Sequence, residues 1–154
     1  AFVVGKRAKH LTAANALDCL AGYSAFNDGS LRDYQRKSTQ WTIGKNFDAT
    51  GGFGPWLVTP DEIADPHQLP MWLDVDGKRF QNGSTSTMVY GVKFLIAYLS
   101  RFMSLQSGDI ISTGTPPGVG MGQKPPVFLR AGQTMHLGID GLGEQTQKVV
   151  AFKA

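Results

Sequence analysis

The clearest alternation of apolar and polar positions lies between residues 71 and 84. The stretch "MWLDVDGKRFQNGS" alternates on both sides of Asp76-Gly77, a dipeptide that suits the positive φ angles of a type I′ turn. This pattern predicts a β-hairpin. Shorter runs of the same kind predict further strands at residues 2–6, 23–26, 56–59 and 109–113, and two or three more between residues 127 and 152.

Helical periodicity is strongest over residues 86–105. Apolar side chains recur there at spacings of three and four, which predicts one amphipathic helix that ends before Gly108; they are Met88, Val92, Leu95, Ile96, Leu99, Phe102 and Met103. A short helix between Thr12 and Gly22 and a helical turn over residues 30–37, capped by Ser30, are also expected. Strands outnumber helices and do not alternate strictly with them, so the predicted fold class is strand-rich α+β with a folded or rolled sheet.

Composition narrows the class of protein. With 154 residues, 42% hydrophobic and 18% charged, the chain has the length and composition of one folded domain with a single core. The net charge of +3 is scattered, so no nucleic-acid partner is expected. No apolar run approaches the roughly 20 residues of a membrane span. The only cysteine is Cys19, which excludes an internal disulfide and a cysteine zinc site and favours a cytoplasmic protein.

Polar chemistry is concentrated between residues 26 and 56. Asp28 follows a predicted strand, where a carboxylate is a good hard-oxygen ligand for Mg²⁺ or Mn²⁺. The alternative is that Asp28 only binds backbone amides of the turn over residues 27–29. Arg32 and Asp33 form either part of a site or an ion pair on a solvated turn.

Two further candidates lie outside regular periodicity. Lys45 stands between Gly44 and Asn46, where its ammonium could bind a carboxylate or a developing enolate, or could be an ordinary exposed lysine. Thr115, in "TGTPPG", offers a hydroxyl that could hold a carboxylate, or lies in a simple tight turn. The glycines of "GVGMGQK" do not match a phosphate-binding loop, and the three histidines share no ligand spacing.

Five motifs occur in one order along the chain: "AFVVGK", "GYSAFNDGSLRDYQ", "WTIGKNFDATGGFGPWLVTPDEI", "GDIISTGTPPGVG" and "GLGEQTQKVV". Together they resemble the fumarylacetoacetate hydrolase family in order and spacing. The resemblance implies a mixed β-sandwich roll that is commonly homodimeric. It also implies the use of Mg²⁺ or Mn²⁺, with Ca²⁺ as a further candidate, on small 2-oxo and 1,3-dioxo acids.

The resemblance assigns a role to each candidate residue. Asp28 is similar to the family's metal-binding aspartate, and Lys45 to the catalytic lysine of its G-K-x-F-D motif. Arg32 and Gln35 match the substrate-contacting positions of R-D-x-Q. Thr115 matches the threonine of the T-G-T-P loop, which meets the substrate carboxylate.

One departure from the family pattern affects the expected activity. The family's other two metal ligands form an E-x-E pair immediately before the strand that begins here at Phe2. Ala1 falls just past the expected place of that pair, so the pair is missing from the 154 residues. Residues 1–154 are therefore interpreted as a single catalytic-domain fragment. The expected reaction is metal-dependent hydrolysis of a C–C bond in a small 2,4-dioxo acid, an acylpyruvate or a fumarylacetoacetate-like acid. The alternatives are an oxaloacetate-type decarboxylase or keto-enol isomerase, and a catalytically silent core.

Overall fold

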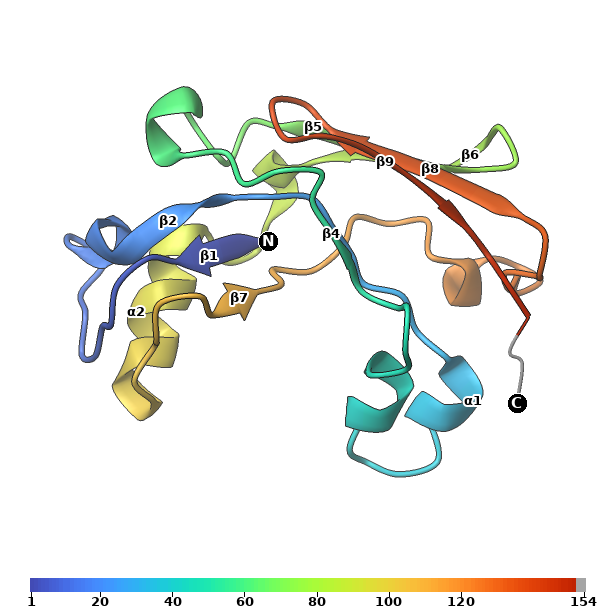
Figure 1. Cartoon of the computed structure of the whole chain (residues 1–154), viewed down its shortest axis with the longest axis horizontal. Helices are drawn as coiled ribbons and strands as arrows, with labels where there is room; N and C mark the ends of the chain where they lie inside the picture. The colour runs from blue at the N-terminus through green and yellow to red at the C-terminus, as the bar shows by residue number, and fades with distance from the viewer. Residues whose placement is uncertain (152–154) are drawn as a thin grey trace.

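The computed structural model describes residues 1–151 and contains three small sheets with little helix (Figure 1). Every strand pair formed by named strands in this part of the chain is antiparallel. The strand-rich α+β class predicted from the sequence is therefore confirmed. Phe152, at the end of the last predicted strand region, lies outside the described residues. No helix among residues 1–151 has the length and apolar character needed to cross a membrane.

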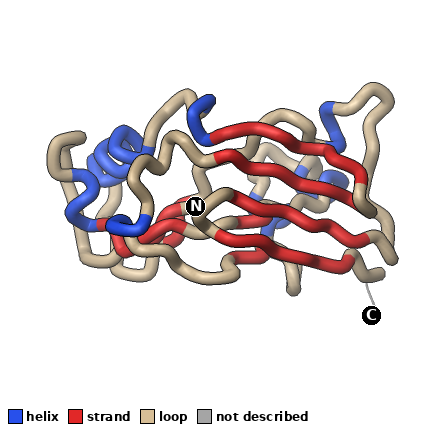
Figure 2. Tube along the Cα trace, turned by 90° about the horizontal axis from the view of Figure 1, so that it is seen from above, coloured by secondary structure: helices blue, strands red, loops and turns tan. Residues whose placement is uncertain are grey.

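The largest sheet has four strands in the order β6-β5-β8-β9, seen side by side in Figure 2. They are β5 (Pro70–Val75), β6 (Lys78–Ser84), β8 (Thr134–Ile139) and β9 (Gly143–Lys148). The predicted hairpin is confirmed, since β5 and β6 pair from Val75↔Lys78 onward. Its turn residues Asp76 and Gly77 have φ angles of 49° and 76°, as a type I′ turn requires.

A second sheet contains the centre of the hydrophobic core. Its order is β2-β1-β7, with β1 at Phe2–Val4, β2 at Leu20–Tyr23 and β7 at Ile110–Ile111. The helix α2 (Val92–Phe102) lies beside this sheet (Figure 1). Phe2, Val4 and Ile96 are fully buried in one cluster, and burial of apolar surface of this kind is the main favourable term in folding.

The remaining elements are short. A two-stranded ribbon pairs β3 (Phe26–Asn27) with β4 (Gly52–Phe53). One turn of α-helix, α1, spans Arg32–Gln35. The 3₁₀ turns are η1 (Ala16–Cys19), η2 (Thr42–Lys45), η3 (Pro60–Glu62), η4 (Thr85–Thr87) and η5 (Gly120–Gly122).

Several predicted elements differ from the structure. The helix expected over residues 86–105 is limited to α2, and Phe102 and Met103 are 65% and 52% exposed rather than part of its buried face. The expected helix after Thr12 is only the turn η1, because the chain from Leu20 onward pairs with β1. Residues 56–59 make a single bridge, Tyr23↔Val58, instead of a strand.

Two further predictions concern local burial and capping. Ser30 does not cap α1, since the N-cap residue is Leu31. The strand expected at residues 109–113 shortens to β7, whose Ile110 is 49% exposed rather than buried. Capping depends on the residue at which the helix begins, and burial depends on the packing of other segments; a sequence pattern shows neither directly.

The start of α2 depends on a distant histidine. Gly91 is its N-cap residue and has no side chain with which to accept a hydrogen bond. Instead, the Val92 backbone N–H donates to Nε2 of His67 at 3.0 Å. A Cβ atom on residue 91 would lie 2.8 Å from the same nitrogen, so glycine lets His67 approach one of the four unpaired N–H groups at the helix start.

We expect the change His67→Ala to lower the free energy of unfolding by about 1 kcal/mol, the usual cost of losing a capping acceptor. The measurement is the urea midpoint followed by circular dichroism. His67→Gln is the matched control, because its amide oxygen can accept the same bond, and we expect it to retain most of the stability. Equal midpoints for His67→Ala and the wild type would show that this contact contributes nothing.

Candidate functional site

The ribbon of β3 and β4 is attached to the four-stranded sheet by two glutamines of β9. Gln145 donates through Nε2 to the Gly54 carbonyl at 2.6 Å and to the Ala25 carbonyl at 3.2 Å. Gln147 accepts a hydrogen bond from the Asn27 side chain. A side chain on Gly52 would overlap Gln147, whose Nε2 lies 1.7 Å from the position of an added Cβ. These contacts fix the backbone from which Asp28 projects.

Asp28 and Lys45 form an ion pair. Lys45 Nζ lies 2.8 Å from Asp28 Oδ2, with the lysine side chain 27% exposed and the aspartate side chain 43% exposed. Asp28 follows β3, whereas Lys45 is the last residue of η2. The structure thus brings together two candidate residues that are 17 positions apart in the sequence, at a place that solvent can reach.

The elements α1 and η2 pack directly on one another. The Leu31 N–H donates to the Gly44 carbonyl at 3.0 Å, and Gly44 is buried against α1. An added Cβ at Gly44 would lie 2.5–2.6 Å from Cβ, Cα and N of Gln35. Since real Cβ atoms do not approach backbone this closely, the contact requires glycine. It places Lys45 beside the helical turn that carries Arg32 and Gln35.

Arg32 and Gln35 are joined by a hydrogen bond. Arg32 Nη1 donates to Gln35 Oε1 at 2.7 Å, and Gln35 is 6% exposed. The Arg32–Asp33 ion pair considered from the sequence does not form within residues 1–151, where the guanidinium meets Gln35 instead. This bond to Gln35 uses one N–H group of the Arg32 guanidinium. The remaining N–H groups lie in one plane, an arrangement that suits hydrogen bonding to a carboxylate.

Thr115 lies in a separate loop that is held by the hairpin. Gln81 of β6 donates through Nε2 to Thr115 Oγ1 at 2.7 Å and to the Pro116 carbonyl at 2.8 Å. A hydroxyl that accepts a hydrogen bond can still donate its own proton. In Figure 1, this loop and the pair α1 and η2 lie on the same side of the four-stranded sheet.

A cavity of about 270 Å³ lies next to Thr115. Its walls include hydroxyl side chains from Ser112 and Thr113 and apolar surface from Phe26 and Met71. None of its lining residues carries a formally charged side chain. Asp28, Lys45, Arg32 and Gln35 are not part of the lining. However, Asp28 is two residues from Phe26 of the cavity wall, so their Cα atoms are at most about 7 Å apart.

One titratable side chain of the cavity wall is shifted toward its uncharged form. Burial, followed by the nearby Asp65 carboxylate, raises the pKa of Tyr23. This is the direction expected in a poorly solvated environment, so the cavity suits an uncharged portion of a ligand.

The residues present do not make a metal site by themselves. Asp28 supplies the right kind of donor for Mg²⁺ or Mn²⁺, but such ions take about six oxygen ligands. Among residues 1–151 no group of three or more His, Cys, Asp or Glu side chains could hold a metal ion. The one candidate carboxylate is already paired with an ammonium group.

Some residues that shape the site were not predicted from the sequence. Gln81, Gln145 and Gln147 lie on strands of the large sheet and position the two groups of candidates. Along an alternating strand these glutamines look like ordinary solvent-facing residues. Only the arrangement of the ribbon and the Thr115 loop over this sheet gives them a structural role.

Comparison with known families identifies the class of this chain. Residues 1–150 match the family described as Fumarylacetoacetate (FAA) hydrolase C-terminal, so the chain belongs to the fumarylacetoacetate hydrolase family. A curated Burkholderia cenocepacia protein, named only as a candidate hydrolase, is 58% identical over 148 residues. That match covers 95% of this chain and 52% of the relative. The chain spans about half the length of the curated relatives it matches.

Solved structures of the family share this fold. A fumarylacetoacetate hydrolase from Exiguobacterium antarcticum is 40% identical with a TM-score of 0.95, covering 98% of this chain and 54% of that one. A 5-carboxymethyl-2-hydroxymuconate delta-isomerase from Mycobacterium smegmatis is 35% identical with a TM-score of 0.87, covering 99% and 57%. The family fold is therefore shared by proteins named as hydrolases and as isomerases.

Proposed function

We propose that this chain forms part of an enzyme that hydrolyses a C–C bond in a small 2,4-dioxo acid of the acylpyruvate type. The observation that carries the proposal is the cluster of Lys45, Asp28, Arg32 and Gln35 at the end of β3. The cavity with Thr115 in its wall supports it, as does membership of a family that contains hydrolases.

The proposed reaction breaks the bond between carbons 3 and 4 of the acid. Water adds to the 4-oxo carbon, the C3–C4 bond breaks, and its electron pair remains on the 2-oxo acid fragment as an enolate. The enolate then takes up a proton, so that a 2-oxo acid and a second carboxylic acid leave. The negative charge that develops on the enolate oxygen is what the site has to stabilise.

The proposed roles follow from charge and hydrogen-bonding capacity. Lys45 uses one of its three N–H donors on Asp28, which leaves two for the enolate oxygen. Arg32, held by Gln35, and the Thr115 hydroxyl, held by Gln81, would bind and orient the substrate carboxylate. The uncharged cavity would take the acyl group. Positioning of this kind lowers a barrier without any proton transfer.

The same proposal includes a requirement for Mg²⁺ or Mn²⁺. Asp28 is the only proposed ligand of that ion among the described residues. A divalent ion would act as a Lewis acid on substrate oxygens. Its other ligands would be water, the substrate or groups outside residues 1–151. A cytoplasmic location is also proposed, supported by the single, unpaired and buried Cys19.

The testing experiment compares acylpyruvate hydrolysis with oxaloacetate decarboxylation by this chain, with Mg²⁺ or Mn²⁺ present. We expect faster turnover of the acylpyruvate. Turnover of oxaloacetate alone would favour the decarboxylase. Interconversion of keto and enol forms without cleavage would favour the keto-enol isomerase; one family structure is named as a delta-isomerase.

A second candidate is a silent core without activity, which the lack of a three-ligand metal group among residues 1–151 favours. Calorimetric titration of Mg²⁺ separates it from the enzyme. Binding that is lost in Asp28→Ala but kept in the matched change Asp61→Ala, at an exposed carboxylate with no proposed role, would reject the silent core. Absence of heat at millimolar Mg²⁺, together with absence of turnover, would support it.

A further inference from the structure

Three side-chain amides form a continuous series of hydrogen bonds between β9 and the ribbon of β3 and β4. Asn27 Nδ2 donates to Gln147 Oε1, and Gln147 Nε2 donates to Gln145 Oε1 at 2.9 Å. Gln145 Nε2 then donates to the Gly54 carbonyl at 2.6 Å. We call Asn27, Gln147 and Gln145 the amide bridge.

The direction of every hydrogen bond in the amide bridge follows from one of its ends. Gln145 Nε2 meets three backbone carbonyls at 2.6–3.4 Å, those of Gly54, Ala25 and Gly52. Carbonyls only accept hydrogen bonds, so the NH₂ group of Gln145 must face the ribbon, and its oxygen is left to accept from Gln147. The Gln147 oxygen in turn accepts from Asn27. The bridge therefore requires an N–H donor at each of its three residues.

The other end of the amide bridge agrees with this direction. An amide NH₂ group has two hydrogens, and Asn27 Nδ2 has two acceptors, Gln147 Oε1 and the Met135 sulfur at 3.7 Å. The bonded groups are amides, carbonyls and a thioether, which do not titrate. The titratable neighbours in sequence are Glu144 and Lys148 on β9, His136 on β8 and Asp28 after β3. Glu144 and Lys148 are exposed, on the other face of β9 from the two glutamines.

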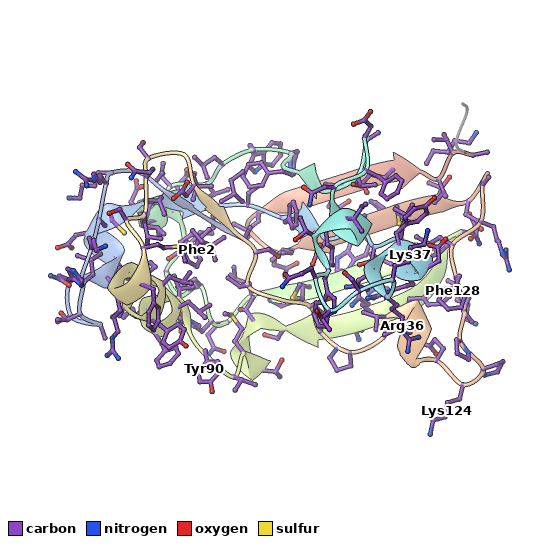
Figure 3. The ribbon with its side chains drawn as sticks, turned by 90° about the horizontal axis from the view of Figure 1, so that it is seen from below. Phe2, Arg36, Lys37, Tyr90, Lys124 and Phe128 are labelled. Atoms are coloured by element: carbon purple, nitrogen blue, oxygen red, sulfur yellow. The ribbon has the colours of Figure 1, made fainter. Side chains whose placement is uncertain are left out.

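The amide bridge ends one residue before the ion pair. Asn27 is the last residue of β3, and the next residue, Asp28, lies 2.8 Å from Lys45 Nζ. The ribbon contains only two residue pairs, so its own pairing constrains its orientation toward the large sheet weakly. Seen from below in Figure 3, the ribbon and α1 lie in front of that sheet, with Lys37 marking the end of α1.

We propose that Gln145 is a positioning residue for the reaction: acting through Gln147 and Asn27, it sets the position of Asp28 and so of the ion pair with Lys45. The inference rests on the proposed function, in which Lys45 stabilises the enolate. It requires a donor at Gln145 and not only a side chain of that size. A carboxylate in its place would direct acceptor oxygens at three carbonyls, which displaces the ribbon.

The change Gln145→Glu tests the donor requirement, because glutamate has nearly the shape of glutamine. At pH 8 we expect kcat/KM for an acylpyruvate to fall about 30-fold or more, as a displaced positioning group would cause. Neighbouring carbonyl oxygens favour the protonated carboxyl, whose O–H can donate, so at pH 5 we expect recovery to within about fivefold of the wild type at that pH. Gln145→Leu is expected to show the loss without the recovery.

Gln106→Glu is the matched control, since it adds the same charge at an exposed glutamine; we expect wild-type kcat/KM at both pH values. Circular dichroism checks folding. If Gln145→Glu does not fold at pH 8, Gln147→Glu gives the same test, because it lacks the donor to Gln145 and faces one oxygen there instead of three. Wild-type kcat/KM in Gln145→Glu at pH 8, a loss that acidification does not reverse, or a fully active Gln145→Leu would overturn the proposal.

Competitive acetylation at pH 8, read by mass spectrometry, follows the ion pair without turnover. We expect the ratio of Lys45 to Lys37 modification to rise several-fold in Gln145→Glu, as in Asp28→Asn, which removes the partner of Lys45, because an unpaired amine is more reactive. The ratio should not change in Gln106→Glu. If the wild type cleaved no acylpyruvate, the proposed function would fail and this ratio would decide the inference; an unchanged ratio in Gln145→Glu would overturn it.

Discussion

Replacing Lys45 by methionine is expected to lower kcat/KM for an acylpyruvate by about 10²- to 10³-fold, the usual loss when one group that stabilises a developing oxyanion is removed. The change deletes the ammonium that lies 2.8 Å from Asp28 and keeps most of the apolar side chain. Because this ion pair is partly exposed, we expect the free energy of unfolding to change by less than about 1 kcal/mol. Initial rates and urea midpoints measure the two effects separately.

Lys37→Met is the matched control for that experiment. Lys37 also follows α1, but its ammonium lies over the Tyr34 ring at 4.0 Å from the centroid and has no proposed contact with substrate. We expect kcat/KM to stay within about threefold of the wild type after this change. If Lys37→Met and Lys45→Met lost activity equally, general positive charge near α1, rather than the position of Lys45, would explain the effect.

The change Gly44→Ala is expected to damage both stability and activity. The new Cβ would lie 2.5–2.6 Å from Gln35 atoms, two of them backbone, so α1 and η2 would have to separate. Overpacking of this kind costs about 1–3 kcal/mol. A shift of about 1 Å in a positioning group can lower turnover about 100-fold, and here it would separate Lys45 from Arg32 and Gln35.

Gly29→Ala provides the comparison for Gly44→Ala, because an added Cβ at Gly29 meets no atom within 4 Å. Both changes replace a glycine by alanine close to Asp28, so they share the loss of chain entropy in the unfolded state. We expect Gly29→Ala to be within about 0.5 kcal/mol of the wild type and nearly fully active. Indistinguishable urea midpoints for the two variants would show that α1 and η2 are not packed as described.

Features that depend on nearby residues could be predicted from the sequence. The alternation around Asp76-Gly77 predicted the hairpin of β5 and β6, and the structure confirms it. The helix α2 was predicted too, but too long at both ends. Phe102 was assigned to the buried face of this helix, because it fits the apolar spacing as well as Ile96 does, but it is 65% exposed. Spacing shows that side chains share a face and does not show what covers that face.

The residues of the candidate site could be identified from the sequence, but most of their contacts could not. Asp28, Arg32, Gln35, Lys45 and Thr115 were all identified from motifs, and their roles stay predictions. The ion pair of Asp28 with Lys45 and the hydrogen bond of Gln35 with Arg32 could not be read from the motifs. Gln81, Gln145 and Gln147 were missed, since strand alternation assigns them to solvent.

The sequence by itself determined the family, the strand-rich fold class and the identity of the candidate residues, because motif order and residue chemistry are properties of the chain alone. Only the tertiary structure decided which of those residues meet, that Gly44 must lack a side chain, and that Phe102 of α2 is exposed. The physical reason is that these are contacts between segments far apart along the chain. Such contacts depend on how β3, η2, α1 and α2 pack in space, which no local pattern specifies.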